Sequence, residues 1–169
     1  MSNIIPILTP DIIIEEEAWN KIENLENEIL ESCKVLAQHL NLAKHIDTAD
    51  FSVLLTNDQH IKQLNKEYRS QDSATNALSF PTEELHYLNP SGIKILNNST
   101  LGDIVISYET LKKEASEQDK QFINHFKHLL IHSMLHLLGF DHDDDDDAEV
   151  MEAEEIKILA QMNISSPYE

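Results

Sequence analysis

The stretch KQFINHFKHLLIHSMLHLLGFDH, from Lys120 to His142, holds both a core helix and a cluster of histidines. At 100° per residue, apolar side chains gather on one side of this helix and histidines gather on the other. The apolar side consists of Ile123, Leu130, Met134 and Leu137. The histidine stripe consists of His125, His128, His132 and His136. We expect the apolar side to pack in the core and the stripe to line a cleft.

The histidines at the end of this stretch have the spacing H-x3-H-x5-H. His132 and His136 lie one helical turn apart, so their imidazoles can reach one ion. Gly139 can end the helix in a left-handed conformation and let His142 turn back toward the pair. Three imidazoles with an open fourth position are typical of a catalytic zinc site. Copper, nickel and iron also bind imidazole, and the pair His128 and His132 stays open as an alternative.

The spacing of His132 and His136 is also that of the two histidines in zinc peptidases. The motif H-E-x-x-H places a glutamate base directly after the first histidine. Ser133 occupies that position here and cannot serve as that base. The sequence therefore speaks against a metallopeptidase.

Apolar periodicity and turn residues predict a mixed set of strands and helices in the rest of the chain. The expected strands cover residues 4–14, 51–55, 77–80 and 101–107. The expected helices cover 15–40, 108–117, 120–138 and 144–162, with a further helix after the capping residues TND whose face carries Ile61, Leu64 and Tyr68. Residues 82–100 should form an exposed, irregular insertion. We predict an α+β fold in which a small mixed sheet is packed with about five helices. The metal site would lie on a central helix and the turn after it.

Length and composition favour one globular domain over residues 1–169. Cys33 is the single cysteine, so a reducing compartment and a buried thiol are expected. The chain shows neither a signal peptide nor a membrane span, which predicts a soluble, cytoplasmic protein. Its net charge of -19 at pH 7, taken alone, speaks against binding nucleic acid.

Four blocks of the sequence resemble the YbeY family of bacterial metal-dependent endoribonucleases. HSMLHLLGFDH (His132 to His142) resembles the family signature H-G-x-L-H-L-x-G-[YF]-D-H, with Ser133 in place of the usual glycine. LNKEYRSQDSATNALSFP (Leu64 to Pro81) resembles LN-x-x-Y-R…T-D-V-L-S-F-P, with Asn76 and Ala77 replacing Asp and Val. LGDIVIS (Leu101 to Ser107) and the pair Met151 and Glu155 complete the resemblance, which covers most of the chain.

The resemblance implies an α+β fold and a zinc ion bound by His132, His136 and His142. It also implies a single-strand-specific endoribonuclease that acts in 3′ end maturation of small-subunit ribosomal RNA and in ribosome quality control. The implied partners are ribosomal RNA and the small ribosomal subunit, with neither a membrane nor DNA.

Arg69 is the only arginine in the chain, and it aligns with the arginine of the family block. A planar guanidinium matches phosphate oxygens in a bidentate way, and one focused cation allows an acidic protein to bind RNA. We assign catalysis to Arg69, which would stabilise transition-state charge, and to His132 as a metal ligand. A bound metal would polarise a phosphoryl oxygen or activate water. The nucleophile, water or the RNA 2′-hydroxyl, stays open.

Several other polar residues have weaker claims to the site. Asp141 is either a carboxylate that orients a ligand histidine or a turn residue. Asp103 and Ser79 are expected to be structural, and Lys112, Lys113, Lys120 and Lys127 to be ordinary surface lysines. The run from Asp143 to Asp147 should cap the last helix rather than bind a second cation.

Two other functions fit part of this pattern. One is a metal-dependent hydrolase of another substrate, against which the missing glutamate after His132 counts. The other is a non-catalytic, ribosome-associated factor with a structural metal, for which a fourth protein ligand would be evidence.

Overall fold

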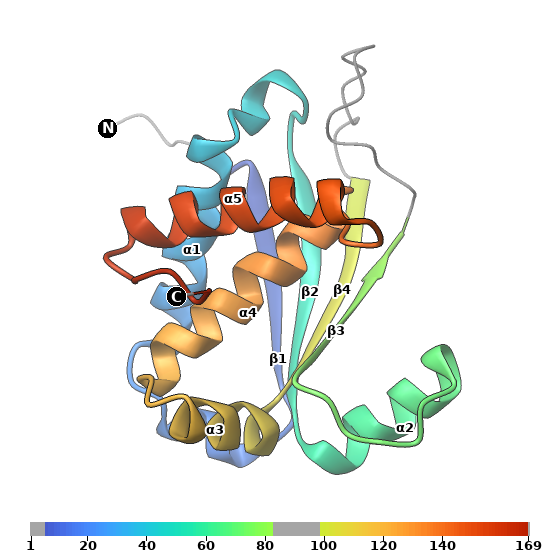
Figure 1. Ribbon diagram of the computed structural model, residues 1–169. Helices are drawn as coiled ribbons and strands as arrows, with labels where there is room; N and C mark the ends of the chain where they lie inside the picture. The colour runs from blue at the N-terminus through green and yellow to red at the C-terminus, as the bar shows by residue number, and fades with distance from the viewer. Residues whose placement is uncertain (1–5, 83–98, 169) are drawn as a thin grey trace.

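The computed structural model describes residues 6–82 and 99–168 (Figure 1). The strands in these residues are β1 (Leu8–Ile14), β2 (Ala49–Thr56), β3 (Ala77–Pro81) and β4 (Ser99–Ser107). The α-helices are α1 (Leu25–His39), α2 (Asp58–Arg69), α3 (Tyr108–Glu117), α4 (Phe122–Leu137) and α5 (Asp145–Gln161). Two short 3-10 helices, η1 (Glu17–Lys21) and η2 (Leu42–Lys44), flank α1. The predicted α+β class, with its small mixed sheet and five α-helices, is confirmed in the described residues.

The four strands form one sheet in the order β1-β2-β4-β3. β1 and β4 both run parallel to β2, and β3 runs antiparallel to β4 at the sheet edge. Gly102 allows β4 to approach β3 closely, because a Cβ atom built there would lie 2.1 Å from the carbonyl oxygen of Phe80. Edge position also explains why Pro10 is tolerated inside β1.

The two faces of the sheet are covered unequally. One face carries the large core, in which α1 packs on β1, α4 packs on β3 and β4, and α5 lies across α4 and α1 (Figure 1). The opposite face carries α2, whose Ile61 packs with Leu78 and Val105. The apolar side of α4 is buried as predicted, with Leu130, Met134 and Leu137 at most 2% exposed. The central position of α4 places its histidines beside α5.

The predicted helix over residues 15–40 is wrong in its first part. The backbone amides of Glu15 and Glu16 still donate to the carbonyl of Leu55, so this segment remains attached to β2. A 3-10 turn follows, which buries Trp19 and directs its indole N–H to the carbonyl of Thr56 at 3.0 Å. Asn24 then takes a left-handed conformation with φ 62° before α1 begins.

Most other predicted elements agree with the structure within a few residues. The irregular segment expected over 82–100 lies largely outside the described residues, but Ser99 and Thr100 already belong to β4. Cys33 is buried, as predicted, and burial raises the pKa of its thiol to about 12. None of the helices in the described part of the chain has the length and apolar character needed to span a membrane.

Candidate metal centre

The end of α4 determines where the third histidine lies. Gly139 has φ 99°, a left-handed conformation that any other residue adopts only with strain. Its amide donates to the carbonyl of His136 at 3.1 Å, and the amide of Phe140 donates to that of Leu135 at 3.0 Å. This pair of bonds is a Schellman motif, which closes the helix and reverses the chain. The reversal brings His142 back beside the last two turns of α4.

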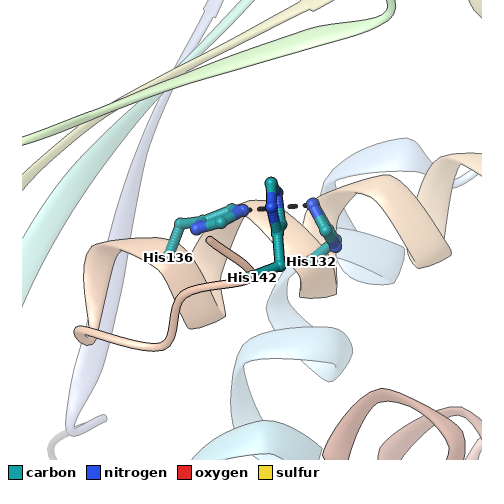
Figure 2. A group of neighbouring side chains, drawn as sticks. All are labelled: His132, His136 and His142. Atoms are coloured by element: carbon teal, nitrogen blue, oxygen red, sulfur yellow. Dashed lines mark hydrogen bonds between the residues drawn. The ribbon is translucent and has the colours of Figure 1, made fainter. Parts of the chain in front are cut away.

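His132, His136 and His142 converge on one point (Figure 2). One ring nitrogen from each lies within 4.8 Å of the others, and the Nε2 atoms of His132 and His136 are 3.1 Å apart. Two nitrogens bound tetrahedrally to one zinc at 2.0–2.1 Å would lie roughly 3.4 Å apart, so this spacing fits a shared ion. The three histidines therefore form a group capable of holding a metal ion, with the helix, turn and returning residue arranged as predicted.

The far nitrogens of the two helical histidines have partners that set their tautomers. His136 Nδ1 donates to the carbonyl of Phe140 at 3.1 Å, and His132 Nδ1 donates to the carboxylate of Glu155. The Phe140 carbonyl and the ionised Glu155 carboxylate can only accept a hydrogen bond, so the proton of each neutral imidazole lies on Nδ1. The lone pair of each ring is then on Nε2. These are the outer contacts that orient histidine ligands in metal sites. Glu155 comes from α5, and apart from its match to the family pattern no feature of the sequence indicated this role.

The surroundings of the site also favour neutral imidazole and ionised carboxylate. Burial, with smaller effects from the neighbouring His132 and His142, lowers the pKa of His136 from 6.5 to about 4. Burial of Glu155 opposes its ionisation, but hydrogen bonds and charge from His132 and Tyr168 outweigh that effect and leave its pKa below the usual value. At neutral pH His136 can therefore offer a nitrogen lone pair to a metal ion, and the Glu155 carboxylate can accept a hydrogen bond from the N–H of His132.

His128 and His125 lie further along the stripe and do not join the triad. His125 is 4% exposed, and its Nε2 lies 3.0 Å from Glu114 Oε1. Both ring nitrogens of His128 are buried without a hydrogen-bond partner in the described part of the chain. Burial lowers the pKa of His128 to about 4, against the opposing effect of Glu155. The prediction that the whole stripe lines a cleft is thus wrong for His125, and the geometry favours His132 with His136 as the helical pair.

Arg69 lies at the end of α2, beside β3, which is the edge strand of the sheet in the described residues. Its Nη2 donates to the carbonyl of Ser79 at 2.9 Å, and its guanidinium carbon lies 4.9 Å from the centre of the Phe80 ring. Because the amide of Thr82 and the carbonyl of Asn76 bond to β4, the alternating pattern points the Ser79 carbonyl away from β4. Within residues 6–82 and 99–168, no contact joins Arg69 to the three histidines. Arg69 and α4 instead meet β3 from its two faces.

The acidic residues around His142 lie in the turn after α4 and at the start of α5. Asp141 is exposed, and its carboxylate accepts a hydrogen bond from the backbone amide of His142 at 2.7 Å, which supports the turn interpretation. Asp144 is the N-cap of α5 and accepts from the amide of Asp147 at 2.8 Å, so the predicted capping role is confirmed for this residue of the acidic run. Asp143 instead lies with Asp141 and His142 in a second, exposed group that could hold a metal ion. Asp103, predicted to be structural, accepts from the hydroxyl of Ser52 at 2.5 Å across two strands.

The departures from the family pattern are accommodated in the structure. Ser133 is 1% exposed inside α4, and the triad geometry is preserved with this small side chain in place of glycine. Asn76 donates to Glu114 at 3.0 Å, and Glu114 also contacts His125. An aspartate at position 76 would instead face the Glu114 carboxylate, so the amide is matched to its neighbour.

Comparison with known proteins identifies a family and several relatives of this chain. The sequence model of the family described as Endoribonuclease YbeY matches residues 12–163. The chain is 41% identical over 164 residues to an Endoribonuclease YbeY of Agrobacterium fabrum, covering 93% of this chain and 92% of that protein. It is 38% identical over 165 residues to that of a Bradyrhizobium strain, covering 96% and 94%.

A solution structure of a Thermotoga maritima protein shares the fold with a TM-score of 0.58 and 23% identity, covering 90% of this chain and 88% of that one. At this identity the likeness concerns the fold alone. The family match and the two relatives together span both the histidine turn and the Arg69 block. The chain therefore belongs to the YbeY family of endoribonucleases.

Proposed function

We propose that the protein is a zinc-dependent endoribonuclease that cleaves single-stranded RNA, acting in 3′ end maturation of small-subunit ribosomal RNA and in ribosome quality control. The observation that carries the chemical part is the convergence of His132, His136 and His142, with the outer nitrogens of His132 and His136 already bonded. The RNA substrate follows from the name that the relatives carry. The ribosomal partner follows from the family resemblance.

The donor set supports zinc and a catalytic site. Three neutral imidazoles are common zinc ligands, and among the described residues this group contains no fourth His, Cys, Asp or Glu; Asp141 and Asp143 form a second, exposed group with His142. A closed structural site would need such a fourth ligand, which disfavours the non-catalytic factor. When bound, the metal supplies a Lewis acid for a phosphoryl oxygen and for water. Ser133, buried where a peptidase has its glutamate, supports phosphodiester over peptide cleavage.

Arg69 would bind the RNA backbone rather than hold the metal. Its two described hydrogen bonds leave further N–H groups of the exposed guanidinium for phosphate oxygens. The bond to Ser79 and the Phe80 ring fix the guanidinium plane at the edge of β3. A phosphate bound by Arg69 would lie beside β3, and the helix that carries His132 and His136, α4, packs against this same strand. In this proposal Arg69 stabilises negative charge that grows during cleavage.

The test is cleavage of a single-stranded RNA by zinc-loaded protein, beside Arg69→Ala and His132→Ala. We expect the wild type to cut, His132→Ala to lose activity, and Arg69→Ala to lose about 100-fold or more, as when a charge-stabilising donor is removed. Equal cutting by all three proteins would point to a contaminating nuclease and contradict the proposal. Zinc binding without any cutting, on free RNA and on small subunits alike, would favour the non-catalytic factor.

A binding assay separates the ligands from their neighbours. His142→Ala should weaken zinc binding by more than about 100-fold, because loss of an outer contact alone costs 10–100-fold. The matched control is His128→Phe, which keeps a ring in place and removes the nitrogens of the alternative ligand. Competition with a chromophoric chelator measures both. Equal loss in the two variants would contradict the assignment of the triad.

A further inference from the structure

A buried chain of hydrogen bonds connects the segment after α5 to His132. Glu155 is 0% exposed, and its two carboxylate oxygens have different partners. One accepts from His132 Nδ1, and the other accepts from the hydroxyl of Tyr168. We propose that Tyr168 is a positioning residue of the metal centre, acting through Glu155 on His132. This inference rests on the metal site proposed above.

The hydrogen-bond requirements of a buried carboxylate support this role. An ionised carboxylate inside a protein needs donors for both oxygens, because unpaired buried charge is costly. His132 offers Glu155 one donor only, since its other nitrogen faces His136. Tyr168 supplies the second donor and thereby fixes the plane of the carboxylate. A fixed carboxylate holds the imidazole of His132 in the orientation that directs Nε2 toward the other two histidines.

The backbone after α5 explains how Tyr168 reaches Glu155. Asn163 takes a left-handed conformation with φ 61°, and the amide of Ile164 donates to the carbonyl of Leu159 at 3.0 Å, so the chain turns back. The amide of Tyr168 donates to the hydroxyl of Ser166 at 3.2 Å. The Tyr168 ring is 45% exposed, while its hydroxyl points inward to Glu155. The chain therefore runs over α4 and α5 and delivers one donor to the site.

The ring of Tyr168 also packs against α4, which offers a competing explanation. Its centre lies 5.8 Å from that of His128, with an interplanar angle of 86°. If packing were the whole role, loss of the hydroxyl would leave the metal site unchanged. The two roles differ in whether the effect of Tyr168 depends on Glu155, and a double-mutant cycle measures that dependence.

The experiment is the zinc dissociation constant of the full chain, from chelator competition, in wild type, Tyr168→Phe, Glu155→Leu and the double variant. Glu155→Leu keeps a similar volume and lacks an acceptor. We expect it to weaken zinc binding roughly 10–100-fold, as other outer contacts of metal ligands do. Tyr168→Phe should weaken it by a smaller factor, roughly 3–10-fold. In the Glu155→Leu background, Tyr168→Phe should have no further effect.

Two controls accompany this cycle. Tyr68→Phe removes a hydroxyl from an exposed tyrosine on α2 and should leave zinc affinity unchanged. Urea unfolding in the presence of a chelator shows whether each variant folds before any zinc value is compared.

Each outcome bears on a different statement. If Tyr168→Phe binds zinc as tightly as wild type while His132→Ala loses binding, the metal site stands and the role of Tyr168 is wrong. The same is true if Tyr168→Phe weakens binding equally with and without Glu155, because the tyrosine then acts by packing. If wild type and His132→Ala bind zinc equally, the proposed metal site fails, and this inference fails with it.

Discussion

At the residue scale, the hydrogen bonds of the second ring nitrogen distinguish the two helical histidines of the triad from the other histidines of α4. His132 and His136 each give the Nδ1 proton to an acceptor, a carboxylate and a backbone carbonyl. His128, one turn earlier, has no acceptor for either nitrogen among the described residues. Hydrogen bonding thus separates neighbouring histidines of one helix stripe: two converge at the candidate metal centre, and one packs as an aromatic ring beside Tyr168.

Acid should destabilise the metal-free protein through His128 and His136. Burial lowers the pKa of both to about 4, whereas an unfolded chain takes up these protons near 6.5. Between these values the unfolded state binds more protons, so the free energy of unfolding falls as pH falls from about 6.5 to about 4. Urea midpoints measured with a chelator at several pH values test this.

The matched variant for this prediction is His128→Phe, which removes one of the two titrating groups and keeps a ring. The slope of unfolding free energy against pH should be shallower than in wild type. An unchanged slope would show that His128 does not remain neutral in the folded protein.

At the scale of elements, the end of α4 and the start of α5 together form the site. The Schellman turn reverses the chain after α4, the acidic N-cap starts α5, and α5 then carries Glu155 back to His132. Neither helix alone contains all of the contacts. The spacing of two helices across a short turn therefore decides whether the three imidazoles meet.

Gly139→Ala should weaken both stability and zinc binding. The left-handed φ of 99° costs a non-glycine residue roughly 1–2 kcal/mol, and relief of that strain would displace His142. We expect a stability loss of about that size and a clear rise in the zinc dissociation constant. Asn57→Ala, which removes the N-cap of α2, should cost about 1 kcal/mol without changing zinc affinity. If both variants retained wild-type zinc affinity, the turn would not position His142.

At the scale of the whole molecule, the charge of -19 limits how RNA can bind. Polyanion binding normally uses many lysines and arginines, and here a single arginine lies beside β3. Lys66 lies on the same helix as Arg69 and adds positive charge nearby, whereas Lys62 on that helix is paired with Asp72 at 3.9 Å. We therefore expect weak RNA binding that depends on a few contacts.

The salt dependence of RNA binding tests this view. Each phosphate contact to single-stranded nucleic acid contributes a slope of about 0.7 in the logarithm of affinity against that of salt. Arg69→Ala should reduce the slope by about that amount, while Arg69→Lys should keep most of it and still lose cleavage, because lysine lacks the planar fork. Fluorescence anisotropy on a short single-stranded RNA measures both. An identical slope in wild type and Arg69→Ala would contradict a phosphate contact by Arg69.

Local patterns in the sequence determined much of this protein. The helix from Phe122 to Leu137, its glycine stop and the return of His142 follow from spacing and from the conformational freedom of glycine, which act over a few residues. The same local rules predicted the capping of α5 and the burial of Cys33. They failed over residues 15–24, where long-range hydrogen bonds to Leu55 and Thr56 overrode an apolar periodicity that suits a helix.

Tertiary structure decided the contacts between distant residues. Glu155 and Tyr168 meet His132 only because α5 packs across α4 and the chain then turns back. Arg69 is placed against Ser79 by the position of α2 on the opposite face of the sheet, which the sequence did not indicate. The physical reason is range: helix spacing and turn chemistry act between near neighbours in the chain, whereas hydrogen-bond partners far apart in sequence are chosen when the core packs.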